Sequence, residues 1–128
     1  MSKILLTWRK FPNVINALNS FRGLPCLYAV TDANERVLRF GESGNLRKRY
    51  WGGNGYMLAA MMHGSGNLIF VAEAPQDMPT RRKLEALLTF QYRPHYSNQG
   101  KSVRPLDAPE VEHAGETPRG IAVPAPND

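Results

Sequence analysis

The chain has 128 residues, of which 42% are hydrophobic, and it carries a formal net charge of +5. This length suits one domain with a modest core, and the ordinary apolar fraction excludes a chain that is disordered throughout. Cys26 is the single cysteine, which excludes an internal disulfide and a cysteine-based zinc cluster. The short apolar run at 4–6 cannot form a signal-peptide core, and no run approaches a membrane span, so we expect a cytoplasmic protein without a membrane partner.

The positive charge is unevenly distributed along the chain. Residues 1–100 contain 13 Lys and Arg against six Asp and Glu, a net charge of +7, whereas residues 101–128 have a net charge of −2. A basic body suits a polyanionic partner such as nucleic acid, although a soluble basic surface would give the same count.

Residues 1–23 are expected to form an N-terminal arm and a helix that pack on the core. The apolar residues up to Phe11 are typical of an extra edge strand or an extended arm. The next apolar residues recur at helical spacing, which predicts a short amphipathic helix ending near Gly23: they are Val14, Ile15, Leu18 and Phe21.

The pattern of residues 24–41 predicts a β-hairpin. Residues 26–30 are a short apolar run of strand formers, residues 32–35 have turn chemistry, and a second run over 37–40 is closed by Gly41. A basic helix is predicted at 45–51, directly after the hairpin. Tyr28, Arg39 and Arg49 are therefore expected to converge on one surface.

The second half of residues 24–100 is predicted to hold two helices and a central strand. The helices are expected at 56–63 and 80–93, the latter with Thr80 as its N-cap, and the apolar run at 68–72 is the best candidate for a central strand. Glu85 lies beside the apolar face of the last helix. Residues 101–128 are rich in Pro, Gly and acidic residues without an apolar period, which predicts a mostly disordered tail.

Together these elements predict a small α/β (α+β) domain. Its sheet is expected to have three antiparallel or mixed strands near residues 25–31, 36–41 and 67–73, flanked by helices. Residues 24–100 would be the core, between the N-terminal arm and the tail.

The order of these parts resembles the GIY-YIG nuclease domain. Cys26-Leu27-Tyr28 stands where that family has Gly-Ile-Tyr, and Arg39-Phe40-Gly41 stands where it has Tyr-Ile-Gly. Arg49 occupies the place of the family arginine, and the stretch from Glu85 through Pro94 to 98 is similar to the end of the excision-repair nuclease domain. The resemblance covers roughly residues 24–100.

This resemblance implies an endonuclease that needs one divalent cation, Mg²⁺ or Mn²⁺, and cleaves nucleic acid, with DNA favoured over RNA. Glu85 would be the metal ligand, and Tyr28 would take a proton from the attacking water or orient it. Arg49 would grip the scissile phosphate, and Arg39 would make a further phosphate contact in place of the second tyrosine. One carboxylate is enough, because Mg²⁺ keeps several of its waters when bound.

Each of these residues also has a structural reading. Glu85 could be a surface acid paired with Arg81 or Arg82, Tyr28 could be a core residue at the sheet edge, and Arg49 could belong to a solvated face. Further nucleic-acid contacts are expected from basic, aromatic and polar side chains near the same surface: Arg47, Lys48, Tyr50, Trp51, His63, Tyr96 and Asn98.

Two other functions remain open from the sequence. Arg39 at the usual tyrosine position, and Cys26 at the usual glycine position, are compatible with a protein that binds nucleic acid without cutting it. The acidic tail could instead dock on a protein partner or cover the basic surface, and a homodimer is also open.

Overall fold

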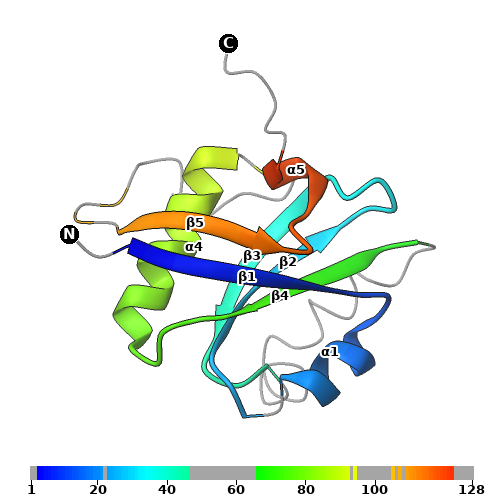
Figure 1. The fold of residues 1–128 in the computed structure, drawn as a ribbon, viewed down its shortest axis with the longest axis horizontal. Coiled ribbons are helices and arrows are strands. Elements are labelled where there is room, and N and C mark those ends of the chain that lie inside the picture. The colour runs from blue at the N-terminus through cyan, green and yellow to red at the C-terminus, as the bar shows by residue number, and fades with distance from the viewer. Residues whose placement is uncertain are drawn as a thin grey trace.

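The computed structural model describes residues 3–21, 23–46, 66–92 and 109–122, together with Pro94, Pro105 and Asp107. These residues form one five-stranded mixed sheet in the strand order β3-β2-β4-β1-β5, with helices on both faces (Figure 1). The expected α+β class is confirmed, whereas the expected three-stranded sheet is wrong. In chain order the elements are β1 (Lys3–Phe11), α1 (Val14–Ser20), β2 (Cys26–Thr31), β3 (Val37–Ser43), β4 (Leu68–Glu73), α4 (Met78–Tyr92), β5 (Glu110–Gly115) and α5 (Arg119–Ala122).

The three predicted strands are present close to their expected bounds, as β2, β3 and β4. β2 pairs antiparallel with both β3 and β4. The turn between β2 and β3 is closed by Asp32, whose carboxylate accepts hydrogen bonds from the backbone N–H groups of Asn34 and Arg36, both at 2.9 Å. The Asp32 to Glu35 stretch therefore forms the turn that its polar composition predicts.

β1 is an interior strand, neither an edge strand nor an arm. It pairs antiparallel with β4 on one side and parallel with β5 on the other. Leu6 and Trp8, at alternate positions, are almost completely buried. This alternation fits a strand with one face on the core, but its place inside the sheet depends on a partner more than a hundred residues away.

The expectation of a disordered tail is wrong for residues 109–122. β5 pairs in parallel with β1, from Lys3 opposite Glu110 to Trp8 opposite Gly115. Ile121 of α5 is 3% exposed and belongs to the main hydrophobic cluster. The segment is too short and polar to predict alone; it is ordered because β1 and the core supply its partners.

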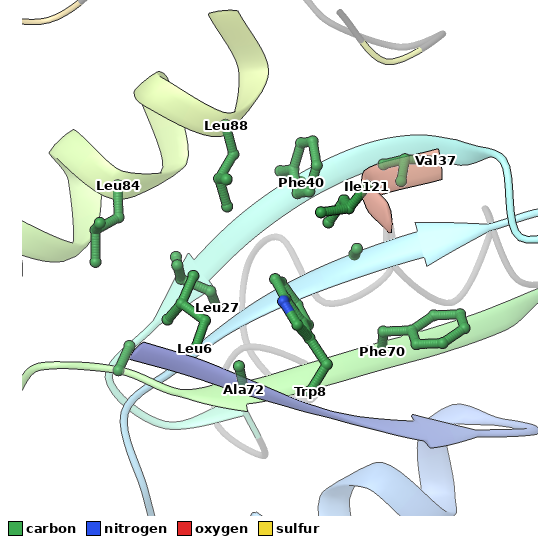
Figure 2. Close-up of a cluster of buried hydrophobic side chains, with 12 residues drawn as sticks. Leu6, Trp8, Leu27, Val37, Phe40, Phe70, Ala72, Leu84, Leu88 and Ile121 are labelled. Atoms are coloured by element: carbon green, nitrogen blue, oxygen red, sulfur yellow. The ribbon is translucent and has the colours of Figure 1, made fainter. Parts of the chain in front are cut away.

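The sheet separates two hydrophobic clusters. On one face α4 and α5 pack through Leu84, Leu88 and Ile121, around the central Trp8 (Figure 2). On the other face α1 packs through Val14, Ala17 and Leu18. β2 contributes to both clusters, because its alternate side chains point to opposite faces.

α4 begins two residues before the predicted start. Asp77 is its N-terminal cap, because the Asp77 carboxylate accepts a hydrogen bond from the Thr80 backbone N–H at 3.0 Å. Thr80 is inside the first turn and is not the cap. Within the residues that the structure describes, no helix is both long and apolar enough to cross a membrane. The helices expected at 45–51 and 56–63 lie outside the described residues, apart from Asn45 and Leu46.

Candidate active site at the β3 edge

Tyr28 lies in the middle of β2 with its ring packed across Gly41. The two residues are direct cross-strand partners, and Tyr28 is 8% exposed. A Cβ atom at Gly41 would lie 2.6 Å from Cε1 of the ring and closer still to Cζ and the hydroxyl oxygen. Only glycine leaves room for the ring here, so Gly41 directs the Tyr28 side chain over β3, the edge strand.

Arg39 shares this face of the sheet. It is paired with Val30, two residues after Tyr28, and alternate residues of a strand lie on the same face. Arg39 is partly exposed. The register therefore places Tyr28 and Arg39 on one face, whereas Arg49, expected on the same surface, lies outside the described residues.

Glu85 belongs to α4, which packs on the other face of the sheet. It is partly exposed on α4, whose Leu84 and Leu88 pack in the cluster opposite to that of Tyr28. α4 also contacts β3 directly through an ion pair between Arg81 and Glu42. Tyr28 and Glu85 are thus on opposite sides of the sheet, and a site that contains both has to be built around the β3 edge.

The remaining predicted site residues lie outside the described part of the chain. This holds for the phosphate-binding candidate Arg49 and for all seven further nucleic-acid contacts, namely Arg47, Lys48, Tyr50, Trp51, His63, Tyr96 and Asn98. Leu46, three residues before Arg49 in the sequence, is fully buried and belongs to the same hydrophobic cluster as Tyr28.

The sequence reading missed a buried ion pair beside the site. Arg81 Nε donates to Glu42 Oε1 at 2.9 Å, and each side chain is 7% exposed. Glu42 alternates with the core residue Phe40, so strand periodicity alone placed a carboxylate on a buried face. A buried charge requires a partner of opposite charge. The position of Glu42 on the buried face could therefore have predicted an ion pair.

A metal site in the described residues would have to depend on few protein carboxylates. Among these residues, no three or more His, Cys, Asp or Glu side chains come together. Glu42 is paired with Arg81, and α4 contains one acidic residue, Glu85. A single carboxylate with several retained waters is a donor set that Mg²⁺ accepts, so Glu85 would hold the cation.

A separate open groove of about 460 Å³ lies on the Tyr28 face of the sheet, but at β1 and β4. Arg9 lines it and stacks on the rings of Phe11 and Phe21, at 5.2 and 5.8 Å from their centroids. The neighbouring Glu73 carboxylate works against phosphate binding there. Of the predicted catalytic residues that the structure describes, namely Tyr28, Arg39 and Glu85, none lines this groove.

No protein-family model matches the chain, and no curated protein or solved structure matches it either. Any function of this chain is therefore inferred from its own residues and from their arrangement around β3.

Proposed function

We propose that this chain is a divalent-metal-dependent endonuclease of the GIY-YIG type, with DNA as the favoured substrate. The packing of the Tyr28 ring across Gly41 carries the proposal. The two residues belong to the two motifs of the hairpin, and they are direct partners in the β2–β3 ladder. A glycine that leaves space for a tyrosine ring gives both motif positions a shared physical purpose.

The chemistry requires a positioned water, a group that handles its proton, and positive charge on the phosphate. Tyr28 would orient the water through its hydroxyl or, as the phenolate, take the proton of the water, and Arg39 would offset the negative charge on the phosphate. A cation held by Glu85 would neutralise charge on the leaving oxygen. β3 and α4 supply a rigid frame for these groups.

The test is a cleavage assay on labelled single-stranded DNA, double-stranded DNA and RNA, each with Mg²⁺, Mn²⁺ or a chelator. We expect cleavage only with metal. Glu85→Gln should abolish it because the carboxylate charge is removed, and Tyr28→Phe should abolish it because the ring remains without its hydroxyl.

Glu73→Gln is the matched control, since it removes an exposed carboxylate at the end of β4, away from the β3 edge. It should cleave as the wild type does. Cleavage that persists in Glu85→Gln or in the chelator would contradict the proposal, as would a wild type that cuts none of the three substrates.

The second candidate is a protein of the same fold that binds nucleic acid without cutting it. Arg39 favours it, because an arginine at the second motif tyrosine adds a phosphate contact and removes a hydroxyl. Salt-sensitive binding without cleavage on any substrate would support this candidate.

A partner bound through an acidic tail is less well supported. Residues 110–115 are a strand of the sheet, and Glu112 is paired with Lys3 at 2.6 Å. Deleting residues 101–128 would remove a structural strand, so it would not isolate a docking function.

A further inference from the structure

The buried pair of Arg81 and Glu42 joins the two halves of the proposed site. Glu42 directly follows the motif glycine Gly41 on β3. Arg81 lies on α4, one turn before Glu85, and residues four apart share a side of a helix. The 2.9 Å contact between Nε and Oε1 therefore links the motif strand to the helix that carries the proposed metal ligand.

The guanidinium of Arg81 holds more than Glu42. Its Nη1 donates to the carbonyl oxygens of Pro75 at 3.1 Å and Gln76 at 2.6 Å, in the loop before α4. A Cβ atom at Gly44 would lie 3.1 Å from Nη2, so that atom sits close to the backbone directly after β3. One side chain thus contacts the motif strand, the loop before α4 and the start of the segment that leads to Arg49.

A buried ion pair is a poor choice for stability alone. Removing two charges from water has a large cost, and well-packed apolar replacements are often as stable or more stable. α4 already has apolar anchors on the sheet in Leu84 and Leu88. These apolar anchors do not define the exact position of α4 on the sheet. Apolar contacts tolerate a small slide or rotation of the helix, whereas directional hydrogen bonds resist it.

We propose that Arg81 is a positioning residue, which with Glu42 sets the height and rotation of the Glu85 turn relative to β3. This inference rests on the proposed nuclease function. It concerns how Glu85 is placed and not which group performs the chemistry. A misplacement of about 1 Å in such a site can reduce turnover about a hundredfold.

The test is the double variant Arg81→Met/Glu42→Leu, which removes both charges and leaves neither buried ion unpaired. We expect it to fold, with a Tm below that of the wild type because the Pro75 and Gln76 carbonyls lose their hydrogen bonds from Arg81. Its kcat should fall by about a hundredfold with little change in KM, and it should need more Mn²⁺ for half-maximal activity. The single variants would leave a buried charge alone, so they serve only to show coupling.

Lys83→Met is the matched control, because it removes an exposed cation from the same helix. It should leave kcat and the Mn²⁺ requirement unchanged. Mn²⁺-induced broadening of the Glu85 backbone amide signal gives a readout without catalysis. The wild type should show it at low Mn²⁺, and the double variant only at higher concentrations.

The outcomes separate the two proposals. A double variant that folds and matches the wild type in kcat, Mn²⁺ requirement and broadening would overturn the positioning role and leave the nuclease function intact. A wild type with neither cleavage nor broadening at Glu85 would overturn the nuclease function and the positioning role with it. A double variant that cleaves slowly and binds Mn²⁺ weakly at Glu85, beside an unaffected Lys83→Met, would establish the inference.

Discussion

At the scale of single residues, the closest fit in the candidate site is the Tyr28 ring over Gly41. The ring occupies the volume that any side chain at position 41 would fill. The ring is buried among apolar neighbours of the α1 face, including Val30 and Val71. Its core role and its proposed chemical role are compatible, since the ring packs in the cluster while its hydroxyl oxygen lies over Gly41 of the edge strand β3.

Gly41→Ala should displace this ring. We expect a loss of about 1–3 kcal/mol in the free energy of unfolding, the usual cost of overpacking a core, and a loss of cleavage because Tyr28 is moved. Urea denaturation measures the first effect and the nuclease assay the second.

Tyr28→Phe separates the two effects, because it keeps the packed ring and removes only the hydroxyl. It should lose cleavage at a smaller cost in stability than Gly41→Ala. If Gly41→Ala were as stable and as active as the wild type, the close packing of position 41 against the ring would be wrong.

His113 makes the stability pH-dependent. Trp8 Nε1 donates to His113 Nδ1 at 2.9 Å, so this nitrogen has to be unprotonated, and burial lowers the pKa of His113. The unfolded state then binds more protons, so the contribution is full above about pH 6.5 and is lost as the pH falls below it. Between pH 7.5 and 5.5, the free energy of unfolding should fall. The slope should stay below about 1.4 kcal/mol per pH unit, the limit set by the uptake of one proton on unfolding.

The measurement is the urea midpoint at several pH values, with His113→Gln as the control. The glutamine oxygen can accept a hydrogen bond from Trp8 but does not titrate. A variant with the same pH slope as the wild type would show that other groups cause the dependence.

At the scale of elements, β5 and α5 complete the sheet and hold the hairpin in place. The Glu35 carboxylate, at the tip of the β2–β3 hairpin, accepts from Lys10 Nζ at 2.8 Å and from the Arg119 backbone N–H at 3.1 Å. Lys10 is the main cause of the lowered pKa of Glu35. The hairpin that carries Tyr28 and Arg39 is thus attached to β1 and to α5.

Ile121→Ala should therefore destabilise the whole fold, by about 2–4 kcal/mol, because it opens a cavity beside Trp8 and Phe40. Truncation after residue 108, which removes β5 and α5, should cost more and expose the edge of β1. Thermal unfolding measures both, and truncation after residue 122 is the control. If the protein truncated after residue 108 had the same Tm as the wild type, the parallel pairing of β5 with β1 would be wrong.

At the scale of the whole molecule, Lys3 and Arg39 lie toward opposite edges of the sheet and differ in their surroundings. Lys3 is paired with Glu112 of β5 at 2.6 Å. Arg39 lies on the edge strand β3, on the Tyr28 face, and is partly exposed. Arg39 is therefore the better placed of the two for a phosphate contact at the candidate site.

This placement of Arg39 predicts a salt dependence for nucleic-acid binding. The logarithm of the association constant should fall linearly with the logarithm of the salt concentration, and Arg39→Gln should reduce the slope by about one. Lys3→Gln is the control, since Lys3 lies at the opposite end of the sheet and is already paired. Fluorescence anisotropy at several salt concentrations gives both slopes; equal slopes for Arg39→Gln and the wild type would remove Arg39 from the phosphate contacts.

The elements that the sequence predicted well are those with strong local signals. The hairpin of β2 and β3, the apolar run of β4 and the amphipathic α1 each depend on patterns within about ten residues. The shared face of Tyr28 and Arg39 depends on the hairpin register, which shifts between Val30 and Thr31 and which no local pattern specifies. The start of α4 was misjudged, because both Asp77 and Thr80 are suitable caps and only the tertiary position of the helix chooses between them.

The sequence by itself determined the α+β class, the positions of β2, β3 and β4 along the chain, and the residue types available to the candidate site. Only the tertiary structure decided that β1 is interior, that β5 is a strand, and that Tyr28 and α4, which carries Glu85, lie on opposite faces of the sheet. The reason is that these features depend on partners far away in the chain. β5 gains its order from β1 across more than a hundred residues, and the charge of Glu42 is tolerated because α4 brings Arg81 to it.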